Sequence, residues 1–150
     1  MSDHCTIEIC LDGIWRQIAH LDLRGDPALG HGATATHLSY DLTYAFEHLG
    51  RRDNEALSVR FPVDVAEHHF SSWPPFLLDL LPTGAGRLRL CHRLGLPTGG
   101  SADWELLRRT GGAPPGNLRI AAGQDAPFTP HPGFVRQEVV ERAEGFIDYC

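Results

Sequence analysis

The sequence contains no lysine, and all 13 of its basic residues are arginine. A Walker phosphate loop, a protein kinase core and a pyridoxal phosphate enzyme each need a lysine at a fixed place in the active site. None of these three active sites can therefore be completed by this chain alone. We expect no catalytic residue and no cofactor of its own in these 150 residues.

Positive charge and long apolar runs are also scarce. The net charge is -6, so the chain lacks the basic stripe that nucleic acid phosphates require. No run approaches the ~20 apolar residues that cross a bilayer, and residues 1–4 do not open a secretion signal. We therefore expect a cytoplasmic protein that binds neither nucleic acid nor membrane directly.

Cysteine is present at four positions without a Cys-x-x-Cys pair, which is typical of free thiols in a reducing cytosol. Nine histidines add further candidate metal ligands. Structural zinc sites usually show two close ligand pairs, and that spacing is missing, so we expect no metal. A small cytosolic metalloprotein or enzyme stays open as an alternative, with these ligands: His4, Cys5, Cys10, His68, His69, Cys91 and His92.

Alternating apolar and polar residues predict antiparallel strands in the first sixty residues. Asp12-Gly13 is a tight-turn signal between the first two strands, and 44–50 has the pattern of one helical turn. In the second strand, Ala19, Leu21 and Leu23 share one phase of the alternation with Trp15 and Gln17. The expected strands are Thr6–Leu11, Ile14–Leu23, Thr34–Tyr40 and Leu57–Phe61.

Helical patterns follow from Pro74 onward. We expect short helices over Phe76–Leu81, stopped by Pro82, and over Arg87–Leu94, stopped by Gly95. A third is expected over Ala102–Thr110 with Ser101 as its N-cap. Residues 116–121 return to strand character.

The pattern therefore predicts an α+β domain over 1–121. We expect a small twisted antiparallel sheet or partly open barrel with about three short helices. A Gly- and Pro-containing linker spans 122–133. An amphipathic helix begins after Gly133 and has no C-cap before Cys150, so 134–150 is expected to be the truncated start of a following region.

Few segments suggest chemistry. The Gly-rich loop 110–117 runs from a predicted helix to a strand, the reverse of a phosphate loop, and is best explained as a structural turn. Asp22 with Asp26, or Glu67 with His68 and His69, offer acid and base groups without a nucleophile motif. Solvated surface positions are the simpler interpretation of all five.

Trp73 is the remaining candidate. It precedes Pro74 and Pro75 at the entrance of a predicted helix. An indole there either packs in the core or stands outward as an anchor for a partner, and burial is the commoner outcome.

Residues 57–120 carry a recognisable order of features. An alternating strand ending in Pro62 precedes an aromatic helix that ends in Leu81-Pro82, an arginine-containing helix, a helix of the type Asp-x-x-x-Leu-Leu, and a glycine turn into a strand. This order resembles the N-terminal domain of HipA-family serine/threonine kinases, the toxin components of bacterial toxin-antitoxin systems. Residues 1–56 fit that family's opening sheet in pattern only. The segments concerned are Leu57–Pro62, Phe76–Leu80, Gly86–Leu94, Asp103–Leu107 and Gly112–Leu118, with Leu81, Pro82, Gly112 and Gly116 as motif residues.

The resemblance implies a noncatalytic regulatory and docking domain. The family's kinase core, with its lysine, its ATP and its Mg²⁺, lies downstream in the same chain, and a DNA-binding antitoxin is a further expected partner. The full-length parent would then be a serine/threonine kinase.

The same family suggests an alternative, a free-standing small protein that neutralises a separate kinase. In that case Trp73 and Phe76 would be the candidate interaction residues. The helix that is cut at Cys150 favours the first interpretation.

Overall fold

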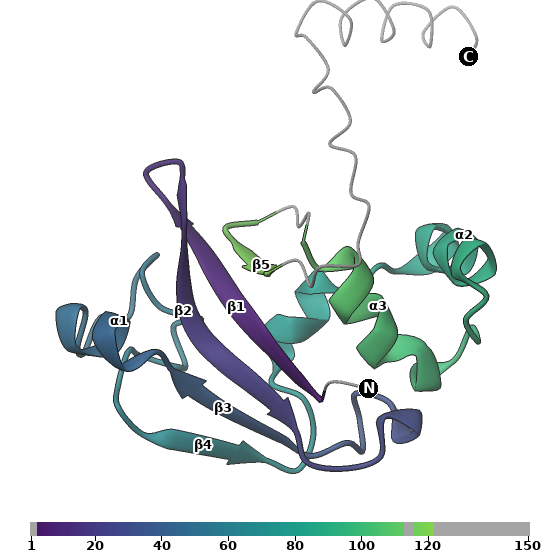
Figure 1. Cartoon of the computed structure of the whole chain (residues 1–150), viewed down its shortest axis with the longest axis horizontal. Helices are drawn as coiled ribbons and strands as arrows, with labels where there is room; N and C mark the ends of the chain where they lie inside the picture. Colours follow the sequence, from purple (N-terminus) through teal and green to yellow (C-terminus); the bar gives the residue numbers. More distant parts are fainter. Residues whose placement is uncertain (1–2, 113–115, 122–150) are drawn as a thin grey trace, which may run out of the picture.

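Strands of one antiparallel sheet form the frame of the protein, in an α+β arrangement (Figure 1). The computed structural model describes residues 3–112 and 116–121. In space the strand order is β4-β3-β2-β1-β5, so the sheet is open, with β4 and β5 at its edges. The strands are β1 (His4–Leu11), β2 (Ile14–Leu23), β3 (Thr36–Tyr40), β4 (Glu67–Phe70) and β5 (Leu118–Ile120).

Short helices connect and cover the strands. The α-helices within the described ranges are α1 (Leu42–Glu47), α2 (Gly84–Leu94) and α3 (Asp103–Thr110). Three short 3-10 helices accompany them: η1 (Pro27–Leu29), η2 (Pro75–Leu80) and η3 (Gly100–Ala102). The predicted α+β class is confirmed, and the predicted linker 122–133 and helix from 134 lie outside the described residues.

Two helix predictions need correction. The segment predicted as a helix over Phe76–Leu81 is the 3-10 helix η2, because proline restricts the residue before it and Pro82 follows within one turn. Ser101 is not an N-cap. It lies within η3, and α3 begins after Ala102 without a side-chain cap.

The β1–β2 hairpin turns at Asp12 and Gly13, as the sequence predicts. Both residues have positive φ, 51° and 78°, which a two-residue hairpin turn of this kind requires. A β-bulge at Ile18 interrupts the expected phase of β2, because Ile7 pairs with Ala19 while Glu8 pairs with Gln17. As a result Ile18 and Ala19 are both fully buried.

Leu57–Phe61 is not a strand. Phe61 N–H donates to Ser58 O (2.9 Å), so the segment folds back on itself, and only the single bridge Ser58–Phe61 forms. The Tyr40 hydroxyl holds this turn, accepting from Leu57 N–H (3.0 Å) and donating to Phe61 O (2.7 Å). The strand that pairs with the other edge of β3, opposite β2, is β4, and its mostly polar residues Glu67–Phe70 gave no alternating signal.

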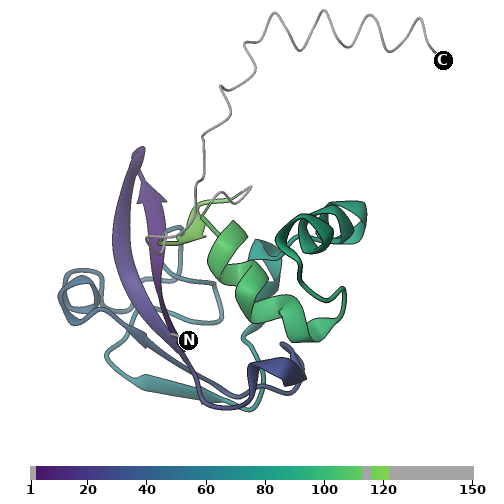
Figure 2. The same ribbon diagram turned by 45° about the vertical axis from the view of Figure 1, so that its right-hand side comes forward.

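The main core lies between one face of the sheet and the layer formed by η2 and α3. Ile7, Leu21 and Leu38 of the sheet are fully buried there, against Leu77 of η2 and Trp104 of α3. Figures 1 and 2 show α3 beside β1 and β5, with α2 on the far side of α3 from the sheet. A smaller cluster of Cys91, Ala102 and Leu106 joins α2 to α3, and Leu81 packs against both clusters.

In the part of the chain that the structure describes, no helix combines the length and apolar character needed to span a membrane.

Candidate functional site

Helix α1 carries apolar side chains on two opposite sides. Asp41 caps its first turn by accepting from Tyr44 N–H (3.1 Å), and Tyr44 and Ala45 are buried against the sheet. On the other side, Leu42 and Phe46 are 62% and 71% exposed. The apolar side chains of a surface helix normally face the core, so Leu42 and Phe46 give α1 a second apolar side that is uncovered.

Two neighbours extend this face. Leu49, just after α1, and Val65, before β4, are also exposed large apolar residues. Leu42 and Val65 line a shared hollow of about 370 Å³. We name Leu42, Phe46, Leu49 and Val65 the α1 patch. The full lining of the hollow is His20, Ser39, Tyr40, Asp41, Leu42, Val65 and Glu67.

Trp73 lies in the core and is 5% exposed. Its backbone N–H donates to His31 O (2.9 Å), and its ring meets Trp104 edge to face at 5.9 Å between centroids. The indole Nε1 is buried without a hydrogen-bond partner among the described residues. This placement agrees with the commoner outcome for an indole, and a role for Trp73 in contacting a partner stays a prediction.

The family-motif side chains near Trp73 are also packed against the core rather than exposed to a partner, as Phe76 and Leu81 show. Phe76 is 9% exposed and contacts the edge of Phe61 at 6.0 Å between centroids. Leu81 bridges the two apolar clusters, and Pro82 separates η2 from α2. Leu81 of the Leu-Pro motif thus contributes to packing, and nothing in these contacts tests a binding role for Phe76.

Of the three described glycines after α3, Gly111 is the one that the packing requires. A Cβ at Gly111 would lie 2.5 Å from Leu107 O and 2.7 Å from Ile120 Cγ1. At Gly112 the nearest atom, Ile120 O, would be at 3.6 Å, and at Gly116 nothing lies within 4 Å. The family motif named Gly112 and Gly116, whereas the close helix-to-strand approach depends on their neighbour.

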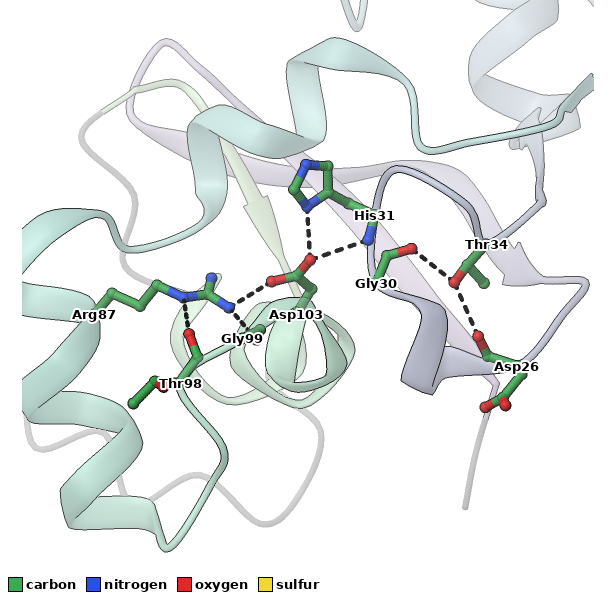
Figure 3. A network of polar contacts seen from close by, with 8 residues as sticks. All are labelled: Asp26, Gly30, His31, Thr34, Arg87, Thr98, Gly99 and Asp103. Atoms are coloured by element: carbon green, nitrogen blue, oxygen red, sulfur yellow. Dashed lines mark hydrogen bonds and ion pairs between the residues drawn. The ribbon is translucent and has the colours of Figure 1, made fainter.

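A buried carboxylate joins the loop after η1 to α2 and α3 (Figure 3). Asp103 at the start of α3 is 1% exposed and lies between Arg87 of α2 and His31 of the loop after η1. Arg87 Nη2 donates to Asp103 Oδ1 (2.6 Å), and His31 N–H donates to Oδ2 (3.0 Å). His31 Nδ1, 2.6 Å from Oδ2, must carry the hydrogen, because an ionised carboxylate only accepts.

These partners decide the ionisation of Asp103. Burial alone would raise its pKa, but the hydrogen bonds from the His31 backbone and ring and from Arg87 outweigh burial, so the pKa of Asp103 is lowered. Arg87 also donates to Gly99 O (2.8 Å). The network ties three segments together: the loop after η1, α2 and the start of α3 (Figure 3).

Glycines allow the two loops of this network to meet. A Cβ at Gly30 would lie 2.9 Å from Gly100 Cα, and the φ of Gly30 is +73°. The loop after η1 and the η3 turn therefore approach backbone to backbone.

The outer face of the sheet, opposite the core, is rich in histidine. Strand pairing aligns His4 with Asp22, Asp22 with His37, and His37 with His69 across four strands. His4 stacks on His20, and His37 stacks on His69. Such a row cannot be seen in the sequence before the strand register is known.

The seven ligands considered from the sequence are not brought together. Among the described residues, the one group of three or more close ligands is His37, Glu67 and His69, of which only His69 belonged to that set. Burial raises the pKa of the Cys5 thiol to about 12, which keeps it protonated at neutral pH and makes it a poor ligand.

The acid and base pairs considered from the sequence are divided in the same way. Glu67 and His69 share the outer face, whereas His68 contacts Asp64 (3.0 Å) and the edge of Phe61. Asp22 lies in the histidine row, and Asp26 caps η1 by accepting from Ala28 N–H (2.9 Å).

Comparison with known proteins agrees with this architecture. The family model for the HipA N-terminal domain matches residues 26–121, which is more than half of the chain. The match runs from the residue that caps η1 to the end of β5 and leaves out only the β1–β2 hairpin among the described elements. No curated protein sequence and no solved structure matches the chain. With the order of η2, α2, α3 and the glycine turn into β5 in place, the chain belongs to the HipA N-terminal domain family.

Proposed function

We propose that the chain is the noncatalytic docking and regulatory domain of a HipA-like serine/threonine kinase of a bacterial toxin-antitoxin system, working in the cytoplasm. The α1 patch is the observation that carries this proposal. Leu42, Phe46 and Leu49 each expose 60% or more of their surface from one short segment, and Val65 lines a hollow together with Leu42. Exposed apolar side chains gathered in this way are typical of a contact with another protein surface.

The partner we propose for the α1 patch is the kinase core of the same chain. The family places that core downstream, and we propose that ATP and Mg²⁺ are bound there, in keeping with the lack of lysine in this chain. A DNA-binding antitoxin is the second proposed partner. The net charge of -6 favours contact with the antitoxin protein over contact with DNA.

A free-standing protein that neutralises a separate kinase is the second candidate function. That function would use Trp73 and Phe76 as exposed anchors. Both side chains are at least nine-tenths buried, so they offer little surface to a kinase active site. The burial of these two residues supports the docking domain over the inhibitor.

The test pairs two surface variants. The 150-residue chain is mixed with the HipA-type kinase core encoded beyond it, purified as a separate protein, and binding is measured by titration calorimetry. Leu42→Glu/Phe46→Glu places two charges in the α1 patch, and we expect it to weaken binding by about tenfold or more. Val59→Glu is the matched control, because Val59 is 73% exposed and outside the patch, and we expect unchanged binding.

Each outcome decides between interpretations. Equal binding by both variants, or no binding by the wild-type chain, would contradict the proposal. Binding that is lost only in Trp73→Phe would favour the inhibitor. Thermal unfolding with and without ATP and Mg²⁺ is a further check, since a nucleotide-binding fold would be stabilised at saturating ligand. We expect no shift.

A further inference from the structure

Strand pairing gathers three metal-ligand side chains on the outer face of the sheet. His37 of β3 pairs directly with His69 of β4, and Ser39 pairs with Glu67. Glu67 is therefore the diagonal neighbour of His37 on the same face, since residues two apart on a strand point the same way. Backbone register, rather than a flexible loop, holds the three side chains together.

The ligand atoms are close to one another. One nitrogen from each imidazole and one carboxylate oxygen lie within 4.8 Å of each other. His37 Nε2 is 3.4 Å from Glu67 Oε2. The His37 and His69 rings stack with centroids 4.4 Å apart and an angle of 4° between their planes.

His37 is unusual for a residue on an outer sheet face, because it is only 9% exposed. Its Nε2 atom is buried and has no hydrogen-bond partner among the described residues, although Glu67 is near. A buried polar atom without a partner costs free energy, and a bound cation would satisfy it. We propose that His37, His69 and Glu67 form a binding site for a Zn²⁺ ion.

The donor set selects the class of metal. Two imidazole nitrogens and one carboxylate oxygen suit zinc and similar transition-metal ions, whereas Ca²⁺ and Mg²⁺ prefer oxygen ligands alone. Three protein ligands leave one position of a tetrahedral ion for water. The exposed edge of the group, at Glu67 and His69, provides access for that water.

One local adjustment is needed. Stacked imidazoles direct their lone pairs along parallel planes, so they cannot aim at a common ion without turning about the Cβ–Cγ bond. His69 is exposed and can turn, whereas the packed His37 stays fixed. Zinc binding should therefore break the His37–His69 stack.

Asp22 and Arg24 face His37 from β2 and the residue after it, and they act in opposite directions. Asp22 Oδ2 lies 3.7 Å from His37 Nδ1, which is too far for a hydrogen bond, but its negative charge favours a hydrogen on that nitrogen, as carboxylates behind zinc-bound histidines do. Arg24 Nη2 lies 3.4 Å from the same Nδ1 and 3.8 Å from Asp22 Oδ2. Its positive charge opposes a cation, and its hydrogen bond must give way when zinc binds Nε2.

The test uses the full chain purified without a histidine tag and stripped with a chelator. Zn²⁺ is titrated by calorimetry, and histidine side-chain NMR signals are followed in parallel, with Mg²⁺ and Ca²⁺ as comparison ions. We expect one zinc ion per chain, with shifts of the His37 and His69 signals and no binding of the comparison ions.

Variants separate this site from adventitious binding. Removing a carboxylate behind a ligand costs about 10- to 100-fold in affinity, so we expect at least that loss for His69→Ala and Glu67→Gln. Both residues are exposed, so we expect these two substitutions to leave the fold intact. His92→Ala, an exposed histidine on α2, is the matched control and should bind as wild type. Arg24→Gln should bind more tightly.

Three results would overturn the proposal: no zinc binding by the wild-type chain, equal binding by His69→Ala and His92→Ala, or NMR shifts confined to other histidines. Thermal unfolding of each variant without metal verifies that a lost signal is not lost folding. Because the measurement needs no kinase, its failure leaves the docking proposal untouched.

Discussion

Asp103 accepts hydrogen bonds from both the backbone and the ring of His31, a residue 72 positions earlier in the chain. With Arg87 on its other oxygen, this carboxylate connects the loop after η1 to α2 and α3. A buried ion that accepts three hydrogen bonds adds little stability compared with a well-packed apolar residue in its place. Removing the ion alone is nevertheless costly, because its buried partners are left unpaired.

Asp103→Asn is the direct test of this junction. The neutral amide leaves the Arg87 charge without its ionic partner. Its NH2 group also takes the place of a carboxylate oxygen that accepts a hydrogen bond, so an N–H donor then faces another donor. We therefore expect the unfolding free energy to fall by about 3 kcal/mol. Urea unfolding measures the change. Asp53→Asn, at an ion pair whose side chains are half exposed, is the control and should change stability by about 0.5 kcal/mol or less. Equal effects would show that the network does not hold the fold.

The same carboxylate predicts an acid-sensitive stability. The pKa of Asp103 in the fold lies below its ordinary value of 3.8, so the folded state favours the ionised form. Its contribution is complete above the unfolded pKa and is lost as pH falls through the folded pKa. The difference in unfolding free energy between wild type and Asp103→Asn should therefore shrink below about pH 4. A difference that grows toward acid would contradict the assignment.

Trp73 is expected to act through packing. Trp73→Ala removes a buried indole between His31 and Trp104, and we expect a loss of about 3–5 kcal/mol by denaturant unfolding. Trp73→Phe should cost less, because it keeps an aromatic ring and removes an N–H without a described partner. If Trp73→Ala unfolds like wild type but loses kinase-core binding, the indole is an anchor after all.

Two adjacent glycines should respond differently to alanine. Gly111→Ala forces a Cβ into Leu107 O and Ile120, and we expect about 1–3 kcal/mol of destabilisation. Gly112→Ala meets only an ordinary contact and should change stability by about 0.5 kcal/mol or less. Thermal unfolding of the two variants distinguishes them. A larger loss of stability in Gly112→Ala than in Gly111→Ala would contradict the tight contact assigned to Gly111.

The Tyr40 hydroxyl is the fourth probe of the fold. It accepts from Leu57 and donates to Phe61, and burial raises the pKa of Tyr40 to about 12. Tyr40→Phe leaves two backbone groups without this partner, so we expect a loss of about 1–3 kcal/mol. Because the folded pKa is raised, the stabilisation is present below the unfolded pKa of 10.0 and is lost as pH rises through about 12. Denaturant unfolding at neutral pH measures the first effect. An unfolding free energy of Tyr40→Phe equal to that of the wild type would show that the hydroxyl does not stabilise the fold.

Local signals predicted the β1–β2 hairpin turn and the end of α2. Asp12-Gly13 determines its own turn, and Gly95, with φ of +66°, ends α2 where the sequence places the stop. These features depend on neighbouring residues alone, which is why a single sequence reveals them.

Features that depend on distant partners could not be predicted. Leu57–Phe61 alternates like a strand, but the Tyr40 hydroxyl makes two hydrogen bonds to the backbone of this segment. Gly30 and Gly100 meet only in the fold, and so do His37 and Glu67. In each case the decisive contact joins segments far apart in the chain, and no local pattern encodes it.

The position of β5 has a consequence for synthesis on the ribosome. β1 is the first strand to be made, yet its second edge is covered by β5 and the residues that flank it, Asn117 and Ala121, near the other end of the described chain. Until this segment emerges, the nascent protein has an unpaired strand edge of the kind that recruits strands from other molecules. A messenger RNA truncated before codon 118 would thus yield an aggregation-prone fragment with an unpaired strand edge rather than a smaller folded domain. Cellular proteases would have to remove that fragment.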